Sequence, residues 1–275
     1  MSEATFDPEF DLLTRKIASD RNFGCRSYKE KCLRRRIAVR MRARGVHTYG
    51  HYAQILDTDA DEYELLLDAL TINVTRLFRN PETYRALAEQ VIPRLWERTE
   101  GRLDVWSAGC SSGEEAYTLA ILIHRHAEAL GQLSWLTRVR VVGTDIDRAS
   151  LEAAERAEYG ESAFADTPAS VRADYFSAQS PFVLRGDVRR MVRFERRDLL
   201  REPAPEARDE GMHLIACRNV IIYFDRGTQE TLFDRFHDSL ASGGYLVLGK
   251  VETLLGASRA RFATVESRER IFQRT

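Results

Sequence analysis

The 275-residue sequence has few cysteines, and they form no recognisable pattern. Cys25, Cys32, Cys110 and Cys217 are scattered, with no CxxC pair and no histidine at the spacing of a zinc site. Structural zinc sites and disulfide-rich domains both show regular spacings of this kind. We therefore expect no metal site, no disulfide framework and a reducing compartment.

Long apolar segments are also missing. No run approaches the roughly 20 apolar residues that are needed to cross a bilayer. The segment MSEATFDPEF at the start is acidic and lacks the basic and then apolar pattern of a secretory signal. The sequence thus predicts a cytoplasmic protein without membrane insertion, and we expect it to be a monomer.

A surplus of either charge is missing as well. The 41 Lys and Arg residues nearly balance the 42 Asp and Glu residues, which gives a formal net charge of −1. This balance argues against a general nucleic-acid binder, although a local basic patch can exist within a neutral total. Hydrophobic residues make up 44% of the chain, which is typical of a folded globular protein.

The sequence contains two styles of pattern that meet near residue 95. Apolar positions recur with helical spacing over residues 1–95, which predicts a helical N-terminal domain. Residues 96–275 alternate short β-rich runs with helical stretches, which indicates an α/β domain with a mainly parallel sheet. The expected strands lie in 102–108, 138–145, 192–199, 212–219 and 244–250, and the expected helices in 114–130, 147–158 and 227–241.

An irregular stretch interrupts this alternation at about residues 172–197. The runs FVLRG (182–186) and RRMVRF (189–194) flank a Gly-Asp turn sequence. The pattern predicts a small inserted antiparallel β-hairpin subdomain made of these two runs.

The stretch VWSAGCSSGEEAYTLA, residues 105–120, joins an expected strand to an expected helix through a glycine turn. It lacks the Gly-Lys-Ser/Thr end of a P-loop, and Gly109 and Gly113 alone do not make the GxGxxG spacing of a dinucleotide site. Glu114 and Glu115 stand at the helix N-terminus, where they would repel a pyrophosphate. S-adenosylmethionine avoids this conflict, because it carries an ammonium and a sulfonium and no phosphate.

A further acid follows the next expected strand. Asp145 ends the run VVGTD and is suited to accept hydrogen bonds from two ribose hydroxyls. Each feature has a plainer explanation, because glutamates in a first helical turn complement the helix dipole and an acid such as Asp147 often caps a helix. The two features together, at the ends of successive strands, favour a nucleoside ligand.

Five motifs resemble those of the chemotaxis receptor methyltransferases, the CheR family. They are LTINVTRLFRNPETY (70–84), VWSAGCSSGEEAYTLA, GTDID (143–147), RRDLL (196–200) and CRNVIIYFD (217–225), in the family's order. The resemblance implies a helical domain and a Rossmann-like domain with an inserted β-subdomain. It also implies methyl transfer from S-adenosylmethionine to glutamates on the cytoplasmic helices of chemoreceptors, with S-adenosylhomocysteine as the product.

The resemblance also implies which residues bind the cofactor. Together with Gly109 of the turn, they are Asn73, Thr75, Arg79, Glu114, Glu115, Asp145, Asp198, Leu199, Arg218 and Asn219. Arg79 is expected to steer either the acceptor carboxylate or the methionine carboxylate, and an inter-domain or surface salt bridge is its alternative. Tyr223 is expected to position the acceptor with its hydroxyl, and its alternative is a core tyrosine with a satisfied hydroxyl.

A strongly basic segment, SYKEKCLRRRIAVRMRAR, spans residues 27–44. Its apolar positions recur every four residues and are expected to face a core: Leu33, Ile37 and Met41. Acidic receptor helices would be attracted to the basic side, so Arg36 and Arg40 are expected to bind the substrate. The alternatives are a solvated charged face, nucleic-acid binding, for which interleaved aromatic platforms are missing, and a signalling module that binds cofactor without turnover.

The resemblance leaves two points open. Some family members dock a receptor C-terminal peptide on the hairpin subdomain by strand addition, and the sequence does not decide whether this chain does. Lys250 and Val251 stand where the family commonly has a His-Ser pair.

Overall fold

The computed structural model describes residues 7–21, 23–71, 74–208 and 210–275, which fall into two compact units. The smaller unit holds the described residues up to 71 together with the segment Tyr223–Thr228. The larger unit holds the remaining described residues, on either side of that segment.

The smaller unit is helical. Its helices are α1 (Pro8–Arg21), α2 (Glu30–Ala43), α3 (Tyr49–Thr58) and α4 (Ala60–Leu70). Thr48 and Asp59 cap α3 and α4, because their side chains accept hydrogen bonds from His51 N and Glu62 N. The face of α2 that was predicted to be buried is confirmed, since Leu33, Ile37 and Met41 are all buried.

The segment Tyr223–Thr228 joins the helical unit through backbone hydrogen bonds. Lys29 N donates to Tyr223 O at 2.8 Å, and Asp225 N donates to Ser27 O at 2.9 Å. The ring of Phe224 lies edge-on to Tyr28, with 4.9 Å between the centroids. A short piece of chain that is remote in sequence thus completes the smaller unit.

The larger unit is built on a seven-stranded sheet in the order β5-β2-β1-β6-β7-β9-β8. Its strands are β1 (Asp104–Ala108), β2 (Arg140–Asp145), β5 (Val192–Arg196), β6 (Met212–Cys217), β7 (Leu240–Leu248), β8 (Phe262–Glu266) and β9 (Ile271–Arg274). Neighbours from β5 to β7 are parallel, and β9 and β8 add an antiparallel edge. The predicted parallel α/β sheet is confirmed.

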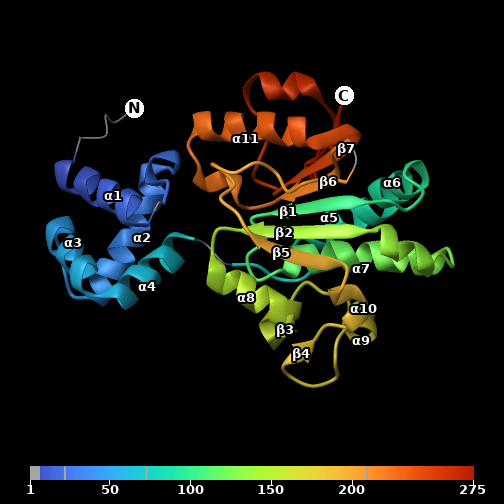
Figure 1. The fold of residues 1–275 in the computed structure, drawn as a ribbon, viewed down its shortest axis with the longest axis horizontal. Helices are drawn as coiled ribbons and strands as arrows, with labels where there is room; N and C mark the ends of the chain where they lie inside the picture. Colours follow the sequence, from blue (N-terminus) through green and yellow to red (C-terminus); the bar gives the residue numbers. More distant parts are fainter. Residues whose placement is uncertain (1–6, 22, 72–73, 209) are drawn as a thin grey trace. The chain divides into compact units, whose positions relative to one another are not determined.

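Helices cover both faces of this sheet. They are α5 (Pro81–Ala86), α6 (Ile92–Arg98), α7 (Glu114–Ala129), α8 (Arg148–Arg156), α9 (Ala169–Tyr175), α10 (Gly186–Arg189) and α11 (Arg226–Ser239). Figure 1 shows α7 and α8 on one side of the sheet and α11 on the other. Trp106 of β1 meets Phe236 of α11, whereas Tyr117 of α7 meets Phe194 of β5. Successive side chains of a strand point to opposite faces of the sheet, so the strands contribute to a hydrophobic core on each face.

The predicted small antiparallel sheet is present, but it pairs different strands from those expected. β4 (Phe182–Val183) pairs with β3 (Glu158–Tyr159), not with the run 189–194. Residues 186–189 form α10 instead of a tight turn, and β5 joins the main sheet parallel to β2. Joining the main sheet as an edge strand gives β5 a parallel pairing with β2 on one side and a place for Phe194 against Tyr117.

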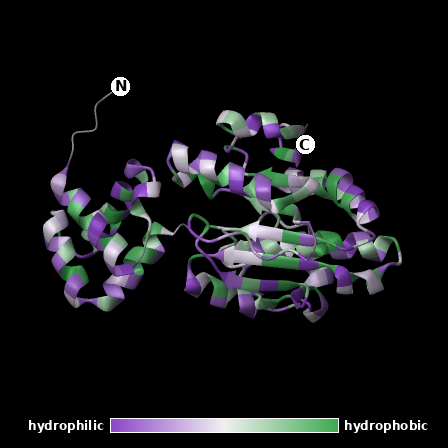
Figure 2. Cartoon of the chain, turned by 45° about the horizontal axis from the view of Figure 1, so that its top comes forward, coloured by the Kyte–Doolittle hydropathy of each residue, from purple (hydrophilic) through white to green (hydrophobic). Residues whose placement is uncertain are grey.

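Hydrophobic residues run along the central strands of the sheet, and the surrounding helices carry hydrophobic and hydrophilic residues side by side (Figure 2). This is the pattern of amphipathic helices that cover a buried sheet.

Within the described residues, no helix combines the length and the apolar character that crossing a membrane would require.

Candidate functional site

The carboxyl edge of the parallel strands contains the topological switch point of the sheet. After β1 the chain moves outward to β2 and then β5, and later returns to the other side of β1 to form β6 and β7. In open α/β sheets, such a reversal leaves a crevice at the carboxyl ends of the two central strands. Here those strands are β1 and β6.

The glycine turn after β1 is held by the neighbouring strand. The amides of Gly109 and Cys110 donate to Thr144 O at 2.8 and 2.9 Å. Gly109 and Gly113 adopt φ values of +77° and +88°, a region that favours glycine. A Cβ on Gly109 would lie 2.6 Å from Val220 Cγ2, so the backbone approaches the loop after β6 too closely for any side chain.

Asp145 lies at the end of β2, half-buried beside this turn. Its carboxylate accepts hydrogen bonds from Ser111 N at 2.8 Å and Asp147 N at 3.0 Å, one on each oxygen. Burial raises the pKa of this carboxyl group above its usual value, against the effect of the two amides. Each oxygen keeps one further acceptor position, which matches the two hydroxyls of a ribose.

Glu114 and Glu115 begin α7 as predicted, and both are held by hydroxyl groups. The Ser112 hydroxyl donates to Glu114, and the Ser107 hydroxyl donates to Glu115 at 2.9 Å. Burial raises the pKa of Glu114 to about 7 and raises that of Glu115 as well. Such perturbed carboxyl groups in one place are a recognised mark of functional sites.

Arg218 follows β6 and connects this edge of the sheet to the start of α5. Its Nη1 lies 3.6 Å from a Glu115 carboxylate oxygen and donates to the Tyr84 hydroxyl at 2.7 Å. Its Nη2 donates to Arg79 O at 2.8 Å and to Asn80 Oδ1 at 3.0 Å. The structure thus brings Glu115, Arg218 and the backbone of Arg79 together.

Three buried polar atoms in the loops that follow β1 and β6 have no hydrogen-bond partner among the described residues. They are Ser111 Oγ, Arg218 Nε and Asn219 Oδ1. Buried polar atoms are almost always paired, so a concentrated group of unpaired ones needs an explanation. A donor N–H, an acceptor carbonyl and a hydroxyl suit a polar ligand that carries both donors and acceptors, such as an adenosyl amino acid.

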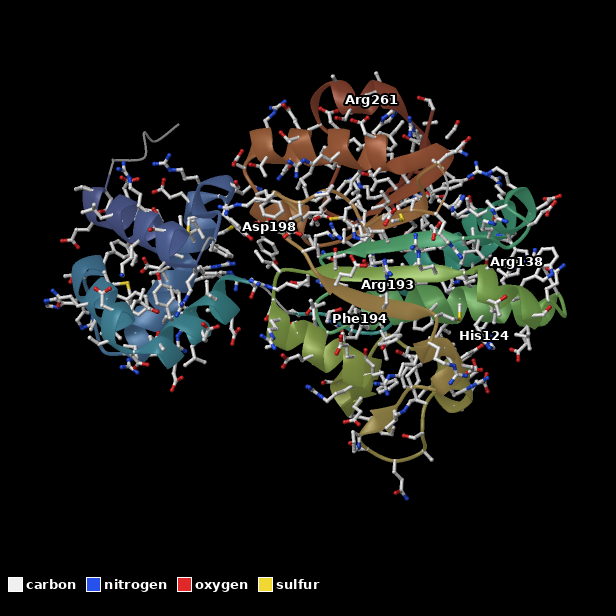
Figure 3. The ribbon with its side chains drawn as sticks, in the orientation of Figure 1. His124, Arg138, Arg193, Phe194, Asp198 and Arg261 are labelled. Atoms are coloured by element: carbon white, nitrogen blue, oxygen red, sulfur yellow. The ribbon has the colours of Figure 1, made fainter. Side chains whose placement is uncertain are left out.

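The other predicted cofactor residues of this unit lie in loops. Asp198 and Leu199 follow β5, and Figure 3 places Asp198 beyond the end of that strand. The Asp198 carboxylate accepts from Leu200 N at 2.9 Å and lies 3.5 Å from Arg201 Nε. Thr75 is half-buried in a segment without regular secondary structure. Asn73 lies outside the described residues.

Three predicted residues, Arg36, Arg40 and Tyr223, belong to the helical unit, and all three have partners inside it. Arg40 forms a bidentate pair with the buried carboxylate of Glu62, at 3.0 and 2.6 Å. Arg36 donates to Ala69 O at 2.6 Å, and its guanidinium lies 5.8 Å from the ring centroid of Tyr223. The expectation that both arginines stand on the solvent side of α2 is therefore wrong, because each is half-buried and anchored.

The exposed side of α2 carries other basic residues of the same segment, which the sequence also placed on its basic side. Lys31, Arg35 and Arg42 are exposed, together with Val39, which is 49% exposed. Any basic surface of this helix is therefore formed by these side chains rather than by Arg36 and Arg40.

Glu252 was not among the predicted site residues. This buried acid follows β7 and accepts from the amides of Gly249 at 2.6 Å, Asn219 at 3.0 Å and Ile222 at 3.2 Å. It fixes the loop in which Asn219 adopts a φ of +62°. An acid shortly after a strand and a glycine was the available signal, but two of its three partners, Asn219 and Ile222, lie 33 and 30 positions away.

The switch point, the glycine turn and the acids at the ends of β1 and β2 define a Rossmann-like nucleoside-binding domain. Two family models match the chain. The CheR methyltransferase all-alpha domain matches residues 8–71, and the CheR methyltransferase SAM binding domain matches residues 73–271. The chain belongs to the CheR methyltransferase family, and it is a methyltransferase that uses S-adenosylmethionine.

Relatives in several bacteria support this assignment. A chemotaxis protein methyltransferase of Listeria innocua is 34% identical, with 95% of this chain and 97% of the relative covered. The putative methyltransferase Cher3 of Pseudomonas putida is 31% identical, with 100% and 99% covered. An uncharacterized 104.1 kDa protein of Rhodobacter capsulatus is 36% identical over 90% of this chain, which spans 25% of that protein's length.

Similarity to solved structures is more distant. A TehB-like SAM-dependent methyltransferase from Corynebacterium glutamicum is 16% identical, with 70% of this chain and 94% of that chain covered and a TM-score of 0.36.

Proposed function

We propose that this protein methyl-esterifies glutamate side chains on the cytoplasmic helices of chemoreceptors and thereby tunes adaptation in chemotaxis. The observation that carries the proposal is the group of buried, unpaired polar atoms beside Glu115 and Arg218, in a chain 34% identical to a chemotaxis protein methyltransferase. Removing one negative charge from a receptor helix changes its repulsion of neighbouring helices, which is a local event with a global readout.

The carboxyl edge offers the groups that the cofactor requires. When bound, S-adenosylmethionine supplies an electrophilic methyl group on a positively charged sulfur. Asp145 would accept the ribose hydroxyls, and Glu115 and Glu114 provide carboxyl groups for its cationic part. Arg218 Nε and Asn219 Oδ1 add one buried donor and one buried acceptor. We propose that Gly109, Thr75, Asn73, Asp198 and Leu199 complete the set.

The acceptor needs little activation. A free glutamate has a pKa of about 4.3, so near neutral pH it is already an anion and needs no general base. The protein must therefore align a carboxylate oxygen with the methyl group and exclude water, which is a problem of orientation. We assign that positioning to Arg79 and Tyr223. Over-stabilising the acceptor's charge would slow the step, because only binding of the transition state accelerates it.

Recognition of the receptor is proposed to involve charge. The exposed basic side chains of α2 would attract acidic receptor helices, and Arg36 and Arg40 would support that face from their anchored positions.

The β3–β4 sheet offers an edge to which a receptor C-terminal peptide could add as a strand, with Val183 of β4 37% exposed. We further propose that the protein acts as a monomer in the cytoplasm.

The direct test is incubation of the protein with isotopically labelled cofactor and a cytoplasmic receptor fragment, followed by mass spectrometry. We expect a methyl ester on glutamate that is lost in mild base, and no label on a fragment whose acceptor glutamates are changed to Ala. Alkali-stable label on nucleic acid would reject the proposal in favour of a different acceptor. Cofactor binding without transfer to any acidic helical substrate would reject it in favour of a binding module.

A further inference from the structure

A separate cavity of about 290 Å³ lies at the amino edge of the sheet, in the same unit. It is lined by Arg98, Thr99, Glu100, Arg102, Arg138 and His213. Figure 3 places Arg138 and Asp198 at opposite ends of the strands, so this cavity is remote from the carboxyl edge. The methyl-transfer chemistry makes no use of it.

Two arginines of the cavity are held in place by backbone carbonyls. Arg98, the last residue of α6, donates from Nη1 to Gly243 O at 2.9 Å. Gly243 has a φ of +65°, and a Cβ there would collide with the Arg98 guanidinium. Arg138 donates to Glu100 O at 3.2 Å, and its guanidinium lies 5.0 Å from the Trp135 ring centroid. Both guanidinium groups are therefore pre-oriented.

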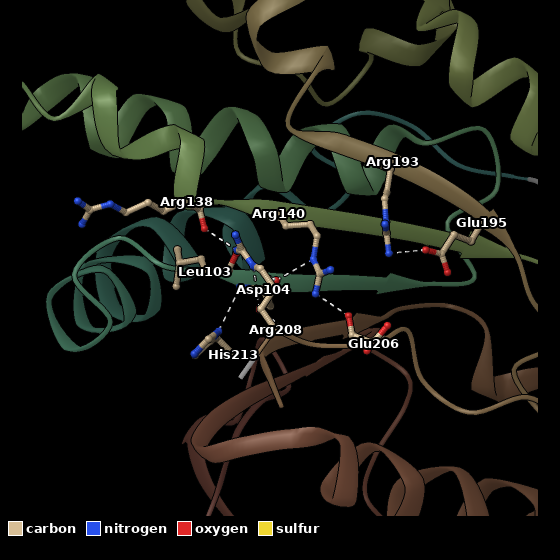
Figure 4. Close-up of polar contacts among 9 residues, drawn as sticks. All are labelled: Leu103, Asp104, Arg138, Arg140, Arg193, Glu195, Glu206, Arg208 and His213. Carbon is tan, nitrogen blue, oxygen red and sulfur yellow. Dashed lines mark hydrogen bonds and ion pairs between the residues drawn. The ribbon is translucent and has the colours of Figure 1, made fainter. Parts of the chain in front are cut away.

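Neither arginine is neutralised by a carboxylate among the described residues, which sets the two apart from their neighbours. Arg140 and Arg208 are both paired with the fully buried Asp104, at 2.9 and 3.1 Å (Figure 4). The contacts of Arg98 and Arg138 are with carbonyl oxygens and a ring. An arginine presents five N–H donors, so each keeps several for a ligand.

His213 forms a buried part of the cavity lining, and the tautomer of its ring is defined. The side chain is 8% exposed, and its Nδ1 accepts a hydrogen bond from Asp104 N at 3.0 Å. A ring nitrogen that accepts from an amide carries no proton, so the proton of the neutral ring is on Nε2. Figure 4 shows this ring at the same edge of the sheet as Arg138.

We propose that this cavity binds the phosphate group of a small phosphorylated molecule. Arg98 and Arg138 give the lining positive charge that no carboxylate of the described residues neutralises, in a chain whose net charge is −1. Arginines from separate segments surround a tetrahedral phosphate from several directions, whereas a planar carboxylate offers two oxygens in one plane. At about ten times the roughly 30 Å³ of a water molecule, the cavity has room for the phosphate and a small organic group.

The test is isothermal titration calorimetry of the full chain with inorganic phosphate and with ribose 5-phosphate. Saturating S-adenosylhomocysteine is present, so that the carboxyl edge is not titrated. The matched variants are Arg98→Gln and Arg138→Gln, with Arg148→Gln as the control, because Arg148 is 82% exposed on α8. We expect each cavity variant to bind ribose 5-phosphate at least tenfold more weakly, the control to bind as the parent does, and affinity to fall with added salt. Urea unfolding of all the variants confirms that they are folded.

Several results would overturn the inference. In the first, the parent protein binds neither probe at millimolar concentration. In the second, the parent and both cavity variants bind the probes equally well. Glutarate that binds as tightly as phosphate would point to a carboxylate ligand instead, and a single-stranded oligonucleotide that binds more tightly than ribose 5-phosphate would point to nucleic acid.

Discussion

Both edges of the parallel sheet place carboxyl groups beside arginines. They differ in how many hydrogen-bond partners each carboxyl group receives from the protein. At the amino edge, Asp104 accepts from Arg140 and from both the side chain and the amide of Arg208. At the carboxyl edge, Glu115 has a hydroxyl at 2.9 Å and Arg218 at 3.6 Å, and buried atoms around it remain unpaired. We call the amino edge closed, because the protein's own groups satisfy its buried carboxylate. We call the carboxyl edge open, because buried polar atoms there have no partner among the described residues.

The difference teaches how a structural ion pair can be told from a binding site. A fully satisfied buried carboxylate stabilises one arrangement of the chain, whereas a partly satisfied one is destabilising unless a ligand completes it. The raised pKa values of Glu114, Glu115 and Asp145 have the same origin, since each carboxyl group is buried or half-buried and has too few partners to offset its desolvation.

The largest effect is expected from Asp104→Asn at the closed edge. The substitution leaves Arg140 and Arg208 without a carboxylate and places an amide N–H against Arg208 N, so it should cost about 3–5 kcal/mol of unfolding free energy. Urea denaturation measures this, and cofactor affinity should be unchanged. The control is Glu152→Gln, which breaks the exposed pair with Arg148 and should cost at most about 0.5 kcal/mol. Equal effects of the two substitutions would contradict the contrast.

A smaller effect, with a defined pH dependence, is expected from Glu114→Gln at the open edge. The Glu114 pKa rises from 4.5 to about 7 on folding, so between these values the folded state holds a proton that the unfolded state has released. Its contribution to the unfolding free energy therefore falls as pH rises, by up to about 3 kcal/mol. Unfolding of both proteins at pH 5 and pH 8 should show that the variant loses less stability over this interval. Parallel pH profiles would show that Glu114 does not titrate in it.

The smallest effect is expected from Asp145→Asn, and it should appear in binding rather than in stability. An asparagine keeps one oxygen acceptor but cannot receive both ribose hydroxyls as a carboxylate does. We expect affinity for S-adenosylhomocysteine to fall about a hundredfold, or about 2.7 kcal/mol, in calorimetry. The unfolding free energy should change by about 1 kcal/mol or less. Unchanged affinity would remove Asp145 from the proposed cofactor site.

The sequence predicted those parts of the molecule that depend on local patterns. The glycine turn, the start of α7 at Glu114 and the buried face of α2 follow from spacings within a few turns of chain. Strands β1, β2, β6 and β7 were found in the same way, because their residues are buried on both faces and apolar runs mark them. The edge strand β5 was found as a β-rich run, although it is only partly buried. The antiparallel strands β8 and β9 were missed, since short antiparallel strands carry a weaker pattern.

Long-range pairings could not be predicted, because spacing carries no information about them. Arg208 meets Asp104 across 104 positions, and Arg40 meets Glu62 across 22. Arg40 was expected in solvent because its partner Glu62 could not be foreseen from the spacing. The pairing instead anchors it inside the helical unit. The partner of β4 was also missed, because a Gly-Asp sequence that suggests a turn begins a helix here.

The segment Tyr223–Thr228 has a consequence for how the protein can be cut and recombined. Because it supplies backbone partners to Lys29 and Ser27 although it lies more than 190 positions later, the helical unit is not one continuous stretch of chain. Suppose that a chimera takes only its first 71 residues from a relative. The transplanted helices would then have to pack against this chain's segment Tyr223–Thr228 instead of the relative's own. During synthesis, too, the smaller unit has to wait for that segment before its last contacts can form.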